Sequence, residues 1–249
     1  MDWRRWASIA RLTIRKMSCP NGSKKLLTQK IIFVKLQWIL RQKKSHPDPE
    51  SFCHELENLR IIILRKKGEN NMIVVHANDP TTRVLRLLYE QREDVTVHIT
   101  EKSTNGAVRR ALKAEDTIMM LGHGNIYGLF SKPNRKGVFT RLLIDDGHTQ
   151  FLRGKTCIGI WCHADEFAYK YKLHGLFSGM IISELQEAID NNILATKEEI
   201  DAEMEKFTLR LKYCIENYPL DEVPQRMLEL DDTKSELTRF NYGNLVYYT

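Results

Sequence analysis

From Met72 onward, short apolar segments alternate with amphipathic helical ones, and this alternation constrains the fold more than any other feature. Short apolar runs bounded by turns are typical of buried strands, whereas apolar residues recurring every three or four positions are typical of helices. The expected strands are Met72–His76, Asp94–Ile99, Asp116–Leu121, Arg141–Ile144, Cys157–Trp161, Gly179–Ser183 and Leu245–Tyr248. The alternation predicts an α/β fold, a three-layer α/β/α sandwich with a mostly parallel sheet.

Two of the expected helices carry clear start signals. Asp79 precedes Pro80 and is expected to cap a helix over Pro80–Gln91. Thr196 and Glu199 have the spacing of a capping box at the start of the clearest helix, Thr196–Tyr218. The other expected helices are Thr104–Ala114, His148–Arg153 and Asp165–Leu173.

Two segments fit this alternation less well. Gly122–Gly137 is rich in glycine and too polar for a buried element. Leu185–Ile189 either belongs with the expected strand before it or forms a helix, and the sequence leaves both alternatives open.

The charge distribution divides the chain near Met72. Residues 1–71 contain 16 lysines and arginines against 6 acidic residues, whereas the remainder contains 22 against 26. Such an asymmetry predicts a basic N-terminal extension, or a helical cap, at residues 1–71 and a separate domain at residues 72–249. Basic charge without aromatic or glycine patterning is a weak signal for nucleic-acid binding, so that partner is a minor alternative for residues 1–71.

Cysteine usage points to a reducing compartment. The five cysteines are odd in number and scattered, and no secretory signal accompanies them. We therefore expect free thiols in a cytoplasmic protein rather than a disulfide framework. The apolar run Ile31–Leu40 is shorter than the roughly 20 residues that a transmembrane helix needs, so no membrane span is expected.

Two of the expected strands end in side chains suited to nucleophilic catalysis. His123 follows Asp116–Leu121 and lies between two glycines, and Cys162 follows Cys157–Trp161 directly. The carboxyl ends of parallel strands lie at one edge of a sheet, so these side chains can meet if the two strands are neighbours. A thiolate is the nucleophile, an imidazole can take its proton, and a backbone N–H such as that of Gly124 can stabilise an oxyanion.

The two motifs, in this order, resemble those of the caspase-like (clan CD) cysteine peptidases. MMLGHG ends at Gly124 and GIWC ends at Cys162. Between them, LLIDDG and RGK are similar to the CHAT-type members, and CHADEFAYKY followed by GMIISE is similar to relatives of clostripain. The resemblance covers about residues 72–190.

The resemblance implies a cysteine endopeptidase that transfers the acyl group of a protein or peptide substrate through a thioester. His123 would be the base, Cys162 the nucleophile, and the N–H groups of Gly124 and Cys162 the oxyanion hole. No metal or other cofactor is implied. Clostripain relatives use an acidic residue two positions before the cysteine to read a basic side chain, and Ile160 stands there in this chain. A basic preference is therefore not carried over.

Other residues are the candidates for substrate binding, and other functions remain open. The candidates are Asp79, Trp161, Ser183 and Glu184. The missing acid motivates one alternative, a catalytically silent caspase-like module that binds a partner. A zinc site made by His123, Cys162 and His163 lacks a close fourth ligand and the usual ligand spacing. A nucleotide-binding α/β domain is disfavoured because the sequence has no phosphate-binding glycine loop.

Overall fold

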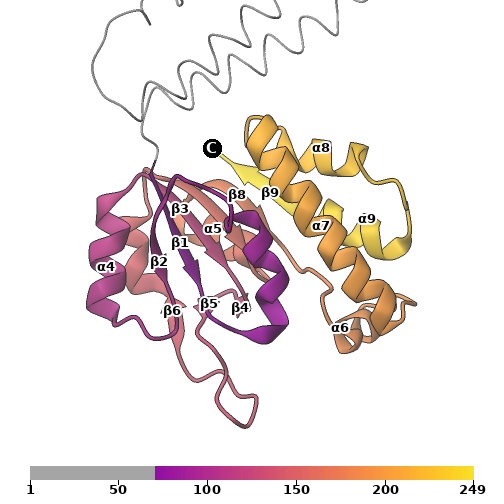
Figure 1. Ribbon diagram of the computed structural model, residues 1–249, viewed down its shortest axis with the longest axis horizontal. Coiled ribbons are helices and arrows are strands. Elements are labelled where there is room, and N and C mark those ends of the chain that lie inside the picture. Colours follow the sequence, from indigo (N-terminus) through magenta and orange to yellow (C-terminus); the bar gives the residue numbers. More distant parts are fainter. Residues whose placement is uncertain (1–70) are drawn as a thin grey trace, which may run out of the picture. The chain divides into compact units, whose positions relative to one another are not determined.

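The computed structural model describes residues 71–249 (Figure 1), so the expected extension or cap lies, except for Asn71, outside the described residues. The described part is an α/β domain around a six-stranded sheet with the order β2-β1-β3-β7-β8-β9. Its strands are β1 (Met72–His76), β2 (Val95–Ile99), β3 (Thr117–Leu121), β7 (Thr156–Ile160), β8 (His174–Ser178) and β9 (Leu245–Tyr248). Five strands pair in parallel and β9 pairs antiparallel with β8, which confirms the expected mostly parallel sheet.

Helices cover both faces of this sheet. They are η2 (a 3₁₀ helix, Pro80–Leu88), α4 (Asn105–Ala114), η3 (a 3₁₀ helix, Asp146–Phe151), α5 (Ala164–Tyr171), α6 (Leu185–Asp190), α7 (Lys197–Asn217), α8 (Val223–Glu229) and α9 (Glu236–Gly243). Val74 and Met119 pack in a core with η2, α7, α8 and α9, whereas Ile73 and Ile118 pack in a second core with α4 and α5. Figure 1 shows α4 and α7 on opposite sides of the sheet. Successive strand residues point to opposite faces, so apolar runs without alternation suit strands covered on both sides.

The expected helix starts are confirmed. The Asp79 side chain accepts a hydrogen bond from Thr81 N, and Thr196 and Glu199 form a reciprocal capping box. The helix after Asp79 is nevertheless a 3₁₀ helix that ends at Leu88, earlier than expected. Within residues 71–249, no helix combines the length and the apolar character that crossing a membrane would require.

The strand expected at Gly179–Ser183 was wrong, because the fifth parallel strand is β8. Ile182 is fully buried, as a strand residue would be. Its N–H donates to Asn241 Oδ1 at 2.8 Å, and its C=O accepts from Asn241 Nδ2 at 3.0 Å. A buried side-chain amide thus supplies the partners that a neighbouring strand would have supplied. Leu185 begins helix α6, which decides between the two alternatives for that segment.

The glycine-rich stretch also differs from expectation. It contains β4 (Gly124–Asn125) and β5 (Gly128–Phe130), which join β6 (Leu142–Ile144) in a separate three-stranded antiparallel sheet. Leu129 in β5 is fully buried, so a polar, glycine-rich composition did not exclude a buried element here. The expected strand at Arg141–Ile144 exists, but it belongs to this small sheet.

Candidate active site

The two reactive side chains lie at one edge of the main sheet. β3 and β7 are neighbours, with Leu121 opposite Ile160, and His123 and Cys162 each follow two residues later. Both side chains line a single small cavity of about 30 Å³. This space holds about two water molecules at most. The space is therefore too small to enclose a peptide side chain in this arrangement.

Most of the cavity wall is apolar. It includes Val84 and Leu85 from η2, Ile160 from β7, Ile181, and Met204 from α7. Ile160, which stands where clostripain relatives have their acid, is 2% exposed and faces this space. The residue at this position can therefore meet a substrate only through apolar contact.

His123 is held by the segment after β1 and by an aromatic ring. Its Nε2 lies 2.7 Å from Thr81 Oγ1, and Thr81 Oγ1 donates to Asp79 Oδ1 at 3.1 Å. The ring of Phe139 lies 5.4 Å from the imidazole, centroid to centroid, with the planes tilted by 52°. These contacts hold the imidazole from two sides.

Cys162 is a protonated thiol in this arrangement. Its Sγ donates to the Ile181 carbonyl at 3.7 Å. Burial raises the pKa of the thiol to about 11, and the negative charge of Glu187 acts in the same direction. Among residues 71–249, the Cys162 thiol is thus hydrogen-bonded to the Ile181 carbonyl and the His123 imidazole to the Thr81 hydroxyl. Proton transfer from Cys162 must accompany its attack on a substrate.

Ser178 holds the end of β7 just before the cysteine. It is fully buried in β8, accepts from Trp161 N at 3.0 Å and donates to Trp161 O at 2.9 Å. His163 then adopts a left-handed conformation with φ 67°, which turns the chain from the strand into α5. Cys162 therefore lies on a tight strand-to-helix turn whose start is fixed to the neighbouring strand.

The side chain of His163 is directed elsewhere. Its Nδ1 lies 2.9 Å from Glu166 Oε1, one turn into α5. Within the part of the chain that the structure describes, no three His, Cys, Asp or Glu side chains gather in a group that could hold a metal ion.

Gly124 and Trp161 connect the small sheet to the main one. Trp161 is 2% exposed, and its indole Nε1 donates to the Asn125 carbonyl at 3.3 Å. A Cβ added at Gly124 would lie 2.1 Å from Trp161 Cδ1, so only glycine allows this approach.

We expect Gly124→Ala to destabilise the domain by about 1–3 kcal/mol, because the indole or β4 must move to admit the methyl group. Urea unfolding measures the change. Gly106→Ala is the matched control, since its Cβ would meet nothing closer than an arginine side-chain atom at 3.6 Å. Its helical position in α4 predicts equal or higher stability. A Gly124→Ala protein as stable as the parent would contradict the packing argument.

The four candidates for substrate binding separate into two pairs. Trp161 and Ser183 line the cavity. The Ser183 N–H and hydroxyl both donate to the Glu187 carboxylate, at 2.7 and 3.1 Å. Asp79 is 7% exposed and its Oδ1 is used by Thr81, while Glu184 is exposed at the start of α6. Neither Asp79 nor Glu184 lines the cavity.

No protein-family model and no curated protein matches this chain. The function is therefore inferred from the geometry of the site. Two residues of that site, Thr81 and Ser178, were not predicted from the sequence. Thr81 lies in the first turn of η2, just beyond the carboxyl end of β1. A hydroxyl at that place could have indicated a site residue. Ser178 had no such signal, because its strand was expected five residues later along the chain.

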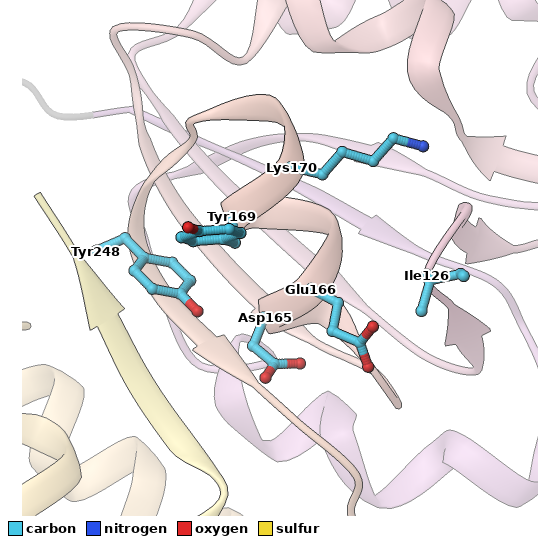
Figure 2. Close-up of a pocket in the computed structure, with 6 residues that line it drawn as sticks. All are labelled: Ile126, Asp165, Glu166, Tyr169, Lys170 and Tyr248. Carbon is cyan, nitrogen blue, oxygen red and sulfur yellow. The ribbon is translucent and has the colours of Figure 1, made fainter.

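A more open hollow of about 350 Å³ lies over α5 and β9. Figure 2 shows four side chains of α5, the strand residue Tyr248 and Ile126 from the β4–β5 turn around it. The α5 side chains are Asp165, Glu166, Tyr169 and Lys170. None of the residues expected to act in catalysis or substrate binding lines this hollow, so the more open cavity and the reactive side chains are separate.

Proposed function

We propose that residues 72–249 form a three-layer, caspase-like cysteine endopeptidase domain in which Cys162 is the nucleophile and His123 the base. The observation that carries the proposal is the pairing of β3 with β7, which brings both side chains to one cavity. A thiol and an imidazole within one small site are the parts that acyl transfer by a cysteine requires. The α/β sheet with helices on both faces agrees with the architecture that the resemblance implies.

In the proposed reaction, Cys162 Sγ attacks the carbonyl carbon of a peptide bond while its proton passes to His123. The tetrahedral intermediate expels the amine, which takes that proton, and leaves a thioester. Water then attacks the thioester, with His123 again as the base, and releases the acid and the thiol. Since burial raises the pKa of Cys162 to about 11, the thiol is neutral at rest and depends on this base.

The hairpin of β4 and β5 supports Gly124 as an oxyanion donor. Phe130 N donates to His123 O at 2.8 Å, so His123 and Phe130 form a hydrogen-bonded pair. Opposite residues in an antiparallel ladder alternate, which makes Gly124 and Leu129 the next, non-hydrogen-bonded pair. The Gly124 N–H therefore points away from β5, and with the Cys162 N–H it is our candidate for stabilising the oxyanion.

The proposal is tested by the alkylation rate of each cysteine against pH, read by mass spectrometry, for the parent and for His123→Ala. In the parent we expect Cys162 to react near neutral pH, where its raised pKa of about 11 leaves almost no free thiolate, because His123 takes the proton as the sulfur attacks. In His123→Ala this assistance is lost, so the rate near neutral pH should fall and follow the free thiolate, which rises about tenfold per pH unit below the thiol pKa.

Cys214 is an internal control in the same sample. It is buried in α7, and burial raises its pKa to about 11 as well. Its rate should be slow and should be the same in both proteins at every pH. If Cys162 follows the same profile as Cys214 in the parent and does not respond to His123→Ala, the dyad is absent. The silent partner-binding module, which the neutral thiol and the small cavity also fit, is then the better proposal.

A further inference from the structure

The hydrogen bonds around His123 place a carboxylate behind the imidazole through one hydroxyl group. Thr81 has a single hydroxyl proton, and it is donated to Asp79 Oδ1 at 3.1 Å. The 2.7 Å contact between Thr81 Oγ1 and His123 Nε2 must then use the proton of Nε2. This assignment of the hydroxyl proton gives His123 the Nε2–H tautomer and leaves Nδ1 to accept a proton.

We propose that Asp79 and Thr81 are positioning residues that hold His123 in this tautomer and stabilise the imidazolium formed when it takes the proton of Cys162. This inference rests on the proposed function. A base oriented by a third group is a recurring arrangement in nucleophilic catalysis, because the third group determines which ring nitrogen carries the proton. Here the carboxylate acts through a hydroxyl rather than by direct contact.

The local structure holds this relay in place. Asp79 is 7% exposed, and the same Oδ1 also accepts from Thr81 N at 3.1 Å, so the η2 cap fixes the carboxylate. Thr81 is β-branched, which restricts the rotation of its hydroxyl. The hydroxyl of the next residue, Thr82, lies instead 3.1 Å from His76 Nε2. The hydroxyl groups of the two adjacent threonines thus contact different histidines. Asp79 is assigned to the positioning of His123 rather than to substrate recognition.

The test uses Thr81→Val, Thr81→Ser and Asp79→Asn in the full chain. The first readout is the tautomer of His123 by ¹⁵N NMR, and the second is the alkylation rate of Cys162 by iodoacetamide at pH 7.5. We expect the parent in the Nε2–H form. Thr81→Val should lose that preference and lower the rate about tenfold, which is part of the roughly 10²–10⁴-fold that a general base contributes.

Thr81→Ser should restore the tautomer and recover the rate to within about threefold of the parent, since it keeps the hydroxyl. Asp79→Asn keeps an oxygen to cap η2 but removes the charge, and should lower the rate at least about threefold. Thr96→Val is the control, because Thr96 lies in β2, does not line the cavity, and carries a hydroxyl that contacts Met72 O and Glu115 rather than His123. In this variant the tautomer of His123 and the alkylation rate of Cys162 should match those of the parent.

Parental tautomer and parental rate in either Thr81→Val or Asp79→Asn overturn the proposal. His123→Ala, measured in parallel, separates this failure from that of the proposed function. If His123→Ala lowers the alkylation rate of Cys162 at pH 7.5 and Thr81→Val does not, only the relay is wrong. If His123→Ala leaves the rate at pH 7.5 unchanged, the dyad itself is wrong.

Discussion

We expect Cys162→Ala to lower the proposed endopeptidase activity at least about 10³-fold, because without the sulfur no thioester can form. The measurement incubates the parent and the variant with a complex peptide mixture and identifies the new termini by mass spectrometry. The thiol is partly buried next to the carbonyl of Ile181, and its removal leaves a small gap without breaking any backbone hydrogen bond. Loss of activity should therefore occur without loss of folding, which circular dichroism checks.

Cys214→Ala is the control for this experiment. Cys214 is a fully buried thiol in α7 that does not line the cavity of His123 and Cys162. Its replacement should leave the cleavage pattern unchanged and the rate within about threefold of the parent, apart from a modest loss of stability. A Cys162→Ala protein that cleaves the same bonds at the parental rate would show that Cys162 is not the nucleophile.

Acidification from pH 7 to pH 4 destabilises the domain in our second prediction, and His76 is the main identifiable cause. Burial lowers the pKa of His76 from 6.5 to about 4, and the charges of His98 and Arg86 act in the same direction. Between these two pH values His76 is protonated in the unfolded chain but neutral in the folded protein. Stability therefore rises with pH across this window, is complete above about pH 6.5, and is lost as pH falls towards 4. The contribution is on the order of 3 kcal/mol.

Urea unfolding at several pH values measures this slope, and two variants locate its source. His76→Gln removes the titrating group, so we expect lower stability at pH 7 but a flatter dependence between pH 4 and 6.5. Tyr89→Phe removes only the hydroxyl that lies 3.1 Å from His76 Nδ1. It should lower stability by about 1 kcal/mol at every pH and keep the slope. Equal slopes in the parent and in His76→Gln would assign the acid sensitivity to other groups.

The parts of the fold that sequence could predict are those that local pattern determines. Apolar runs such as Met72–His76 can only be buried strands or short helix segments, and their flanking turns decide between these. Thr196 with Glu199 marks a helix start because the two side chains satisfy N–H groups that any helix leaves unpaired. The strand at Gly179–Ser183 failed for the opposite reason. Its partner is the side chain of Asn241, about 60 positions away, which no local pattern reveals.

The candidate site divides in the same way. The sequence alone placed a histidine and a cysteine at the ends of two buried strands, because the residue after an apolar run is where a strand leaves the core. Only the tertiary structure decided that these strands are neighbours in register and that both side chains reach one cavity. It also decided that Asp79 points towards Thr81 rather than into the cavity, and that Ser178 holds the strand before Cys162. Strand order and hydrogen-bond partners depend on contacts between distant residues, which local sequence does not determine.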